Sequence, residues 1–220
     1  MTYRKDLIAS LIRDVPDFPE PGVTFKDITP LLANPNGYAA AVSELVDTAS
    51  RDVDVVLGME ARGFMFAGPV ALSLGAGFVP VRKPGKLPGD VYSQSFVLEY
   101  GSATLTVHQD AVQPSSKVLI VDDVLATAGT VRATASIVEQ LGAELVGVSV
   151  LIELSALGGR EKLDRAGIGL DEVRRALPSG TALVSYVRYD ASVPQTPSIA
   201  AGNASGAAQV SRVLQSVPSY

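Results

Sequence analysis

The sequence contains no cysteine and no tryptophan, and His108 is its single histidine. Without cysteine, the chain forms no disulfide and offers no thiolate to a metal ion. A lone histidine in a polar stretch argues against a Ser-His-Asp triad and against a histidine-rich metal site. We therefore expect His108 to lie at the surface.

Long apolar runs and an excess of positive charge are also missing. No apolar run reaches the ~18 residues that a membrane-spanning helix needs. Residues 1–6 are charged and lack the apolar segment of a signal peptide. The net charge of −5 and the pI of about 4.9 argue against non-specific nucleic-acid binding. These absences predict a cytoplasmic protein that binds neither membrane nor nucleic acid.

The chain is long enough for one domain with a substantial core, since it has 220 residues of which 47% are hydrophobic. Residues 191–220 are rich in Ala, Ser, Gly, Pro and Val, and Arg212 is their only charged residue. A segment of this composition does not bury enough apolar surface to fold by itself. We predict a domain at 1–190 and a flexible tail at 191–220, whose role stays open.

Strand patterns alternate with helix patterns along the chain. This alternation predicts an α/β fold with a mostly parallel, twisted sheet and helices on both faces. The predicted strands are 53–57, 77–81, 117–121 and 145–152, and the predicted helices are 2–14, 38–49, 64–74, 131–141 with Gly142 closing it, and 159–163.

Other segments are predicted as irregular structure or as short elements. The pattern gives an irregular arm or short strand at 17–32, a turn at 34–36, a mobile polar stretch at 90–94, a hairpin of strands 95–100 and 103–107, an extra helix at 170–177 and a last strand at 181–186.

The stretch 117–130 organises the chain: it reads K-V-L-I-V-D-D-V-L-A-T-A-G-T. A buried strand is followed by Asp122 and Asp123, then by a small-residue turn at 126–130, then by a helix. Ligands bind at the carboxyl ends of strands in open α/β sheets. Backbone N–H groups at a helix N-terminus hold phosphate, and adjacent carboxylates suit sugar hydroxyls or a Mg²⁺ ion carried with a polyphosphate.

A plainer interpretation of this stretch is a buried strand with a solvated acidic turn and an ordinary helix cap. It is neither a Walker loop nor a dinucleotide fingerprint, because G-x-x-x-x-G-K-[ST] is absent and no G-x-G-x-x-G follows a strand. The order of two acids, two hydroxyls in a small-residue turn and a helix start favours the ligand site.

The stretch resembles the phosphoribosyl diphosphate (PRPP) signature of the type I phosphoribosyltransferases. Further segments are similar to the adenine-specific members of that family, and the resemblance covers residues 5–165. These segments are D-F-P-E-P-G-V-T-F-K-D-I-T-P-L-L (17–32), G-M-E-A-R-G-F (58–64), V-R-K-P-G-K-L-P-G (81–89), L-E-Y-G (98–101) and G-R-E-K-L (159–163).

The resemblance implies a type I phosphoribosyltransferase-like fold with an N-terminal hood at 1–34 and a flexible β-hairpin lid at 84–107. It implies transfer of the phosphoribosyl group of PRPP to adenine, giving AMP and diphosphate, in purine salvage. It further implies Mg²⁺ as cofactor, carried by PRPP near Asp122 and Asp123 rather than held by a dedicated set of side chains. A homodimer is implied as well.

The same resemblance implies a role for each site residue. Glu99, Tyr100 and Arg62 are the catalytic residues, with Glu99 as the acid/base at the purine nitrogens. The 5′-phosphate is assigned to Ala126, Thr127, Ala128, Gly129 and Thr130; the ribose to Asp122 and Asp123; the diphosphate to Glu60, Ala61, Arg82, Lys83 and Lys86; and the adenine to Thr24, Phe25 and Arg62. A cis peptide bond is expected at Glu60–Ala61.

Several alternatives stay open at this point. Without the resemblance, Arg62 reads as a surface salt bridge, the cations at 82–86 as a solvated face, and Glu99 as a solvated hairpin residue. The family turn often reads A-T-G-G-T, so Ala128 costs stability if its φ is positive. Another purine base, or a PRPP-sensing regulator of the same fold, are the competing functions.

Overall fold

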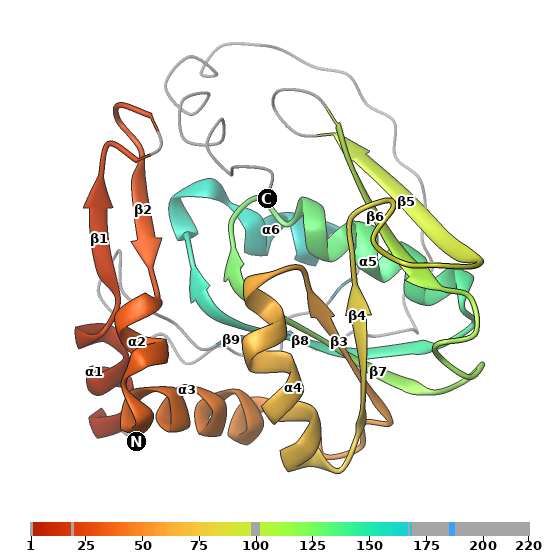
Figure 1. The fold of residues 1–220 in the computed structure, drawn as a ribbon, viewed down its shortest axis with the longest axis horizontal. Helices are drawn as coiled ribbons and strands as arrows, with labels where there is room; N and C mark the ends of the chain where they lie inside the picture. The colour runs from red at the N-terminus through yellow and green to blue at the C-terminus, as the bar shows by residue number, and fades with distance from the viewer. Residues whose placement is uncertain (1, 19, 98–101, 167, 169–184, 188–220) are drawn as a thin grey trace.

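The apolar runs form one sheet of five strands, in the order β4-β3-β7-β8-β9. The structure is a computed structural model that describes residues 2–18, 20–97, 102–166, 168 and 185–187 (Figure 1). Strands β3 (Val55–Met59), β4 (Gly77–Val81), β7 (Lys117–Leu125) and β8 (Glu144–Glu153) are parallel, and β9 (Ser185–Val187) is antiparallel to β8. The predicted α/β class with a mostly parallel sheet is confirmed.

Alternation along β7 divides the core into two layers. Val118 and Ile120 pack into one cluster with residues of α5 (Gly129–Gln140) and α6 (Gly159–Arg165). Leu119 and Val121 pack into the other cluster, on the opposite face of the sheet. Successive side chains of a strand point to opposite faces, so a strand that is apolar at every position is buried on both.

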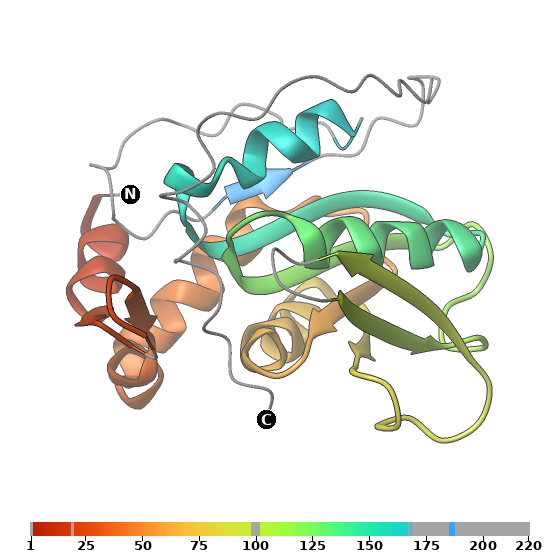
Figure 2. The ribbon, with the colours of Figure 1, turned by 90° about the horizontal axis from the view of Figure 1, so that it is seen from above.

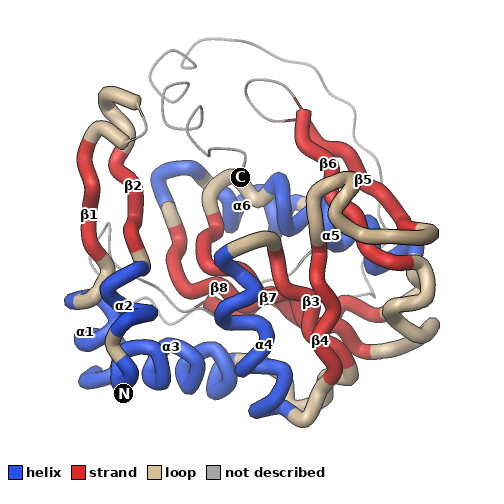
Figure 3. The backbone as a smooth tube through the Cα atoms, viewed as in Figure 1, coloured by secondary structure: helices blue, strands red, loops and turns tan. Residues whose placement is uncertain are grey.

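The second cluster is covered by four helices, α1 (Thr2–Ser10), α2 (Thr29–Ala33), α3 (Pro35–Thr48) and α4 (Arg62–Leu74). Figure 3 shows these helices in blue beside the red strands of the sheet. A 3₁₀ turn, η1 (Ser155–Leu157), precedes α6. Among the described residues, no helix is both long enough and apolar enough to cross a membrane.

Two antiparallel hairpins stand at opposite ends of the sheet, as Figures 1 and 2 both show. One is β1 (Arg13–Pro16) with β2 (Thr24–Asp27), in the region predicted as the hood. The other is β5 (Val91–Val97) with β6 (Ser102–His108), in the region predicted as the lid. The carboxyl ends of the parallel strands point toward the space between the two hairpins (Figure 1). The hairpins therefore flank the edge of the sheet where ligands bind in such folds.

Cross-strand ion pairs hold the β1–β2 hairpin. Arg13 donates to Asp27 at 2.5 Å, and Lys26 donates to Asp14 at 2.6 Å, in the register that sets these residues opposite each other. Hydrogen bonds from Thr29, together with Arg13, outweigh burial and lower the pKa of Asp27 to about 2. The prediction of a helix to residue 14 was wrong, because residues 13–16 form β1. The irregular arm or short strand predicted at 17–32 contains the short strand β2.

Other boundaries also differ from the prediction. The polar stretch 90–94, predicted as mobile, belongs largely to β5, where its residues pair with β6. Ser102 lies in β6 rather than in the turn. The predicted α-helix after the phosphate turn ends as expected, with Gly142 at φ 68°. Residues 170–177 and 191–220 lie outside the described residues, and of the predicted strand 181–186 only the last two residues are described, in β9.

The residues 34–36, predicted as a turn, begin a helix instead. Asn34 is the N-cap of α3, its Oδ1 accepts a hydrogen bond from the Gly37 N–H at 2.9 Å, and Pro35 is the first helical residue. Proline fits that position because its missing N–H would have no partner there. The Asn-Pro pair is thus a helix start rather than a loop.

We predict that Asn34→Ala lowers the free energy of unfolding by about 1 kcal/mol, because the substitution leaves a helix N–H without its acceptor. For a domain of this size, that corresponds to a melting temperature about 2–4 °C lower. Thermal unfolding followed by circular dichroism measures it. Asn36→Ala is the matched control, since Asn36 is exposed in the first turn of α3; equal melting temperatures for the two variants would contradict the cap.

Candidate active site

Two buried carboxylates lie inside β7 rather than after it. Asp122 and Asp123 are 8% and 4% exposed, and β7 continues its pairing with β8 to Leu125. The sequence prediction ended the strand at Val121 because the run of apolar residues ends there. Backbone pairing with β8 continues past that point, so the acid pair is carried into the interior instead of lying in a solvated turn.

The environment of this pair is set by burial and by one cation. Asp122 Oδ1 accepts a hydrogen bond from the Asp123 N–H at 2.8 Å, and Arg62 Nη2 lies 2.9 Å from Asp123 Oδ2. This second contact is an ion pair without hydrogen-bond geometry, and Asp123 Oδ2 accepts no hydrogen bond among the described residues. Burial, then repulsion from Asp123, raises the pKa of Asp122 well above its usual value. Burial also raises the pKa of Asp123, although Arg62 opposes it.

A glycine allows the start of α4 to approach the acid pair closely. A Cβ on Gly63 would lie 2.9 Å from Asp122 Oδ1 and 3.1 Å from the Val121 carbonyl oxygen. No side chain fits there, so glycine is required for the close approach. The turn before it contains the cis Glu60–Ala61 peptide bond, as predicted. The predicted Arg62 is thereby placed beside the predicted Asp123.

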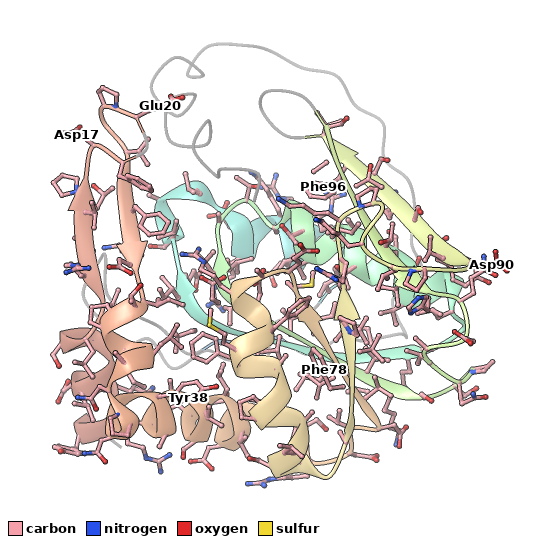
Figure 4. The ribbon with its side chains drawn as sticks, viewed as in Figure 1. Asp17, Glu20, Tyr38, Phe78, Asp90 and Phe96 are labelled. Atoms are coloured by element: carbon pink, nitrogen blue, oxygen red, sulfur yellow. The ribbon has the colours of Figure 1, made fainter. Side chains whose placement is uncertain are left out.

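The turn 126–130 joins the end of β7 to the N-terminus of α5. Ala128 is the N-cap of α5 with φ 67°, and among the described side chains none caps the helix. The first N–H groups of α5 are therefore available to an anion. Phe96 of β5 packs on this turn, because a Cβ on Gly129 would lie 2.9 Å from its ring (Figure 4).

Ala128 has the positive φ that the sequence analysis identified as costly. The left-handed conformation costs an L-residue about 1–2 kcal/mol. Its methyl group is 4% exposed and belongs to the core cluster with α5, so burial offsets part of that cost. The departure from the family turn is thus tolerated by packing.

Aromatic side chains of the first hairpin reach the same region. The guanidinium carbon of Arg62 lies 5.1 Å from the centre of the Phe25 ring, within range of a cation–π interaction. Phe18 packs edge-on against Phe25 with the ring centres 5.2 Å apart. Thr24 is exposed on β2. Phe18 was missed as a site residue, although it lies in the motif at 17–32; only the antiparallel pairing places it against Phe25.

The basic loop after β4 is tied to the turn at Glu60. Arg82 Nε donates to Glu60 Oε2 at 3.2 Å, and the Lys83 N–H donates to the same oxygen at 3.0 Å. Burial opposes ionisation of Glu60, but these two donors prevail and lower its pKa. Arg82 Nη1 also donates to the Lys86 carbonyl at 3.3 Å. The structure therefore brings together Glu60, Arg82, Lys83 and Lys86, which are up to 26 positions apart in sequence.

Comparison with known proteins identifies the family. A model described as the phosphoribosyl transferase domain matches residues 27–169. An adenine phosphoribosyltransferase of Cutibacterium acnes is 98% identical over 169 residues, which cover 77% of this chain and 96% of the relative. The chain belongs to the adenine phosphoribosyltransferase family.

Solved structures of the family have the same fold. The adenine phosphoribosyltransferase of Rhodothermus marinus superposes with a TM-score of 0.70 at 47% identity, over 74% of this chain and 93% of that one. The enzyme of Saccharomyces cerevisiae, complexed with D-2,5-dideoxy-2,5-imino-altritol 1,6-bisphosphate and adenine, gives 0.69 at 35% identity, over 74% and 96%.

Two residues predicted from the family are not among the residues that the structure describes. Glu99 and Tyr100 are outside the described residues; the hairpin is described up to Val97, which pairs with Ser102. A metal site formed by three or more acidic or histidine side chains is absent from the described part of the chain.

One hollow lies away from the site of this phosphoribosyltransferase. It has a volume of about 580 Å³ at the base of the β5–β6 hairpin, near Asp90 in Figure 4, and every residue lining it is exposed or half-exposed. His108 lines it, half-exposed as the sequence predicted, with Nε2 2.7 Å from the Pro88 carbonyl oxygen. No buried charged group lies on its lining, so we assign it no chemistry.

We predict that Asp122→Asn raises the melting temperature at neutral pH. An acid whose pKa is raised by folding stabilises the protein below its unfolded pKa, and that stability is lost as pH rises through the folded pKa. The amide keeps the oxygen that accepts from Asp123 N–H but does not ionise. A gain of about 2–4 °C is expected for each kcal/mol recovered.

Thermal unfolding measured between pH 4 and 8 tests this. The wild type should lose stability relative to Asp122→Asn as pH rises, whereas the exposed control Asp110→Asn should follow the wild type. Parallel pH profiles for wild type and Asp122→Asn would show that ionising Asp122 costs the fold nothing.

Proposed function

We propose that this chain transfers the phosphoribosyl group of PRPP to adenine, giving AMP and diphosphate. One observation carries the proposal: a buried acid pair in β7 leads within a few residues to an uncapped helix N-terminus, with Arg62 and Phe25 beside the acids. The relatives that match most of the chain are named for this reaction. In the reaction, the bond between the sugar C1 and diphosphate breaks, a bond from C1 to an adenine nitrogen forms, and that nitrogen loses its proton.

The turn 126–130 would hold the 5′-phosphate. Its backbone N–H groups open the α5 helix, and the helix dipole favours an anion there. The hydroxyls of Thr127 and Thr130 can add donors. This end of the substrate does not react, so its role is to fix the sugar in place for the displacement.

Asp122 and Asp123 would hold the ribose hydroxyls. Burial raises both pKa values in the free protein. Positive charge that develops next to the pair favours its ionised form. The sugar ring gains positive charge as its bond to diphosphate weakens, as in other displacements at that carbon. Carboxylates fixed beside the ring stabilise that charge more than they stabilise the neutral substrate.

Arg82, Lys83 and Lys86, with the turn at Glu60–Ala61, would bind the diphosphate. The Glu60 carboxylate is already held by Arg82 and the Lys83 N–H, so its part would be to orient these donors rather than to touch the anion. The Asp122 and Asp123 carboxylates would lie near a Mg²⁺ ion carried by PRPP, and oxygen donors of this kind fit Mg²⁺. When bound, Mg²⁺ would neutralise charge on the departing diphosphate.

Phe25, Thr24 and Arg62 would form the adenine site. A purine is flat, and stacking on an aromatic ring holds it at little entropic cost. Arg62 lies over Phe25 and reaches Asp123, so the base site adjoins the ribose site. Phe18 braces Phe25 from its edge and adds a residue to the predicted set.

The roles of Glu99 and Tyr100 remain predictions from the resemblance. Both would act from the segment between β5 and β6, with Glu99 taking the proton from adenine. The packing of Phe96 on Gly129 sets the end of β5 that precedes this segment against the phosphate turn. A lid there would exclude water, which otherwise hydrolyses an activated sugar.

A homodimer and a cytoplasmic location also remain predictions from the resemblance and the composition. A second copy would pack against exposed apolar side chains on α4 and on the edge strand β4. These side chains are Met65, Leu72 and Phe78, which are 37%, 84% and 41% exposed. The mass of the protein in solution tests the dimer, and a monomer at assay concentration would contradict it.

We predict that Phe25→Ala raises KM for adenine and leaves KM for PRPP near the wild-type value. Loss of aromatic stacking on a base costs about 1–3 kcal/mol, which is roughly 5- to 150-fold. Steady-state kinetics with each substrate varied in turn measure it. Tyr3→Ala is the control, because Tyr3 is an aromatic residue 78% exposed on α1; an equal rise in both KM values would indicate a displaced hairpin instead.

The proposed activity is tested by diphosphate release from PRPP and Mg²⁺ with each purine base in turn. We expect release with adenine and a loss of about 10²–10⁴-fold in Glu99→Ala, the usual effect of removing a general acid or base. Glu20→Ala, at a half-exposed carboxylate near the tip of the first hairpin (Figure 4), is the control.

Other outcomes of this experiment favour the competing functions. Release with guanine, hypoxanthine or xanthine in place of adenine would assign a different base to the same fold. Binding of PRPP without release for any base would favour a PRPP-sensing protein.

A further inference from the structure

The G-R-E-K-L motif at 159–163 has no part in the site described so far. Its first residue, however, packs against the first residue of the phosphate turn. Strand β8 ends at Glu153, and the Leu154 N–H donates to the Leu125 carbonyl at 2.9 Å. The chain then passes through η1 and Gly158 and returns as α6. This return places the first residue of α6 against the first residue of the turn 126–130.

The contact is between backbones and depends on Gly159. A Cβ on Gly159 would lie 2.2 Å from the Ala126 carbonyl oxygen and 3.1 Å from the Ala126 carbonyl carbon. Real Cβ atoms do not approach so closely, and the obstacle is backbone rather than a flexible side chain. The backbone at Gly159 therefore limits where the Ala126 peptide group can lie.

An ion pair joins the two ends of the segment 153–160. Arg160 Nε donates to both Glu153 carboxylate oxygens, at 2.8 and 3.1 Å, and Arg160 Nη2 forms an ion pair with Glu153 Oε2. The Glu153 side chain is 7% exposed, so the pair is largely out of water. A forked guanidinium on a carboxylate fixes direction as well as distance. The pair thus ties the start of α6 to the end of β8.

A second ion pair on the same helix provides a contrast. Arg165 lies 3.8 Å from Glu161, and both side chains are more than 70% exposed. Such an exposed pair contributes little. The two arginines of α6 differ in burial and in geometry, and only Arg160 is adjacent to the residue that touches the turn.

We propose that Gly159 and the Glu153–Arg160 pair are positioning residues for the 5′-phosphate turn. They act through the Ala126 peptide group and do not touch substrate. The proposal rests on the assignment of the 5′-phosphate to residues 126–130. Because the N–H groups of a turn bind phosphate only when they converge, a shift of Ala126 would misdirect them.

Five variants test the proposal. Arg160→Ala, Gly159→Ala and Glu153→Gln disturb the segment that contacts Ala126, Arg165→Ala is the matched control, and Thr130→Val reports on the turn itself. Each is assayed for KM of PRPP, KM of adenine and kcat, for AMP binding by calorimetry, and for its melting temperature. Arg160→Ala retains the backbone contact, so it stays informative if Gly159→Ala fails to fold.

We expect Arg160→Ala and Gly159→Ala to raise KM for PRPP and weaken AMP binding by between about tenfold and about 100-fold, since small misplacements at a binding site have effects of this size. KM for adenine should stay within about twofold, and Arg165→Ala should behave as the wild type. Glu153→Gln should fall between the wild type and Arg160→Ala, because an amide oxygen still accepts from Arg160.

Three results would overturn the proposal. Wild-type PRPP and AMP affinities in Arg160→Ala and Gly159→Ala, with weakened affinities in Thr130→Val, would refute the positioning role and leave the phosphate assignment intact. Unchanged affinities in Thr130→Val as well would refute both the positioning role and a contribution of the Thr130 hydroxyl to phosphate binding. Equal losses for PRPP and adenine, with a falling melting temperature, would show that the pair serves only the fold.

Discussion

The site depends on the backbone pairing of β7 with β8 past Val121. The pairing continues through Asp122 and Val124 to Leu125, and it carries two carboxylates to positions that are less than a tenth exposed. Buried carboxylates are costly unless they have partners. The neighbouring elements supply them: Arg62 from α4 lies on Asp123, and Gly63 allows that helix to come close.

The buried acid pair and the turn after it lower the stability of the free protein in the region proposed to bind the substrate. Burial raises the pKa of both acids in the absence of ligand, so the free protein is less stable than it would be with neutral groups there. Ala128 adds a second local cost through its positive φ. The two acids and Ala128 lie at the edge of the sheet where ligands bind in such folds. Strain and perturbed pKa values concentrate at such sites in enzymes.

Residues that are distant in sequence also pack against several parts of the site and hold them in position. Glu60 fixes the beginning of the basic loop, Phe18 braces Phe25, and Gly159 fixes Ala126. Backbone donors bind an anion well only if they are already oriented, because reorganising them during the reaction would cost free energy. These supporting contacts give a structural role to segments of the chain that bear no reacting group.

The sequence by itself determined the order of the chemical groups. Apolar runs and glycines predicted the four parallel strands, the acid pair, the small-residue turn and the helix after it, because these signals are local and each reports the burial or the backbone freedom of one segment. These local signals identified Asp122 and Asp123, whereas Arg62 and Phe25 were assigned to the same region only through the resemblance to the family; in the structure the four residues lie together. The same local signals failed at residues 13–16, 34–36 and 90–94, where a strand, a helix start and another strand were missed.

Only the tertiary structure decided which of these groups touch. The end of β7, the cation–π contact of Arg62 with Phe25, the Glu60–Arg82 pair and the approach of Gly159 to Ala126 all join residues at least 22 positions apart in sequence or depend on a neighbouring strand. No periodicity within one segment encodes such a contact, because its geometry depends on how two separately formed elements pack. The sequence thus specified which groups the site has, and the packing of the sheet, helices and hairpins specified their distances, their burial and their charge.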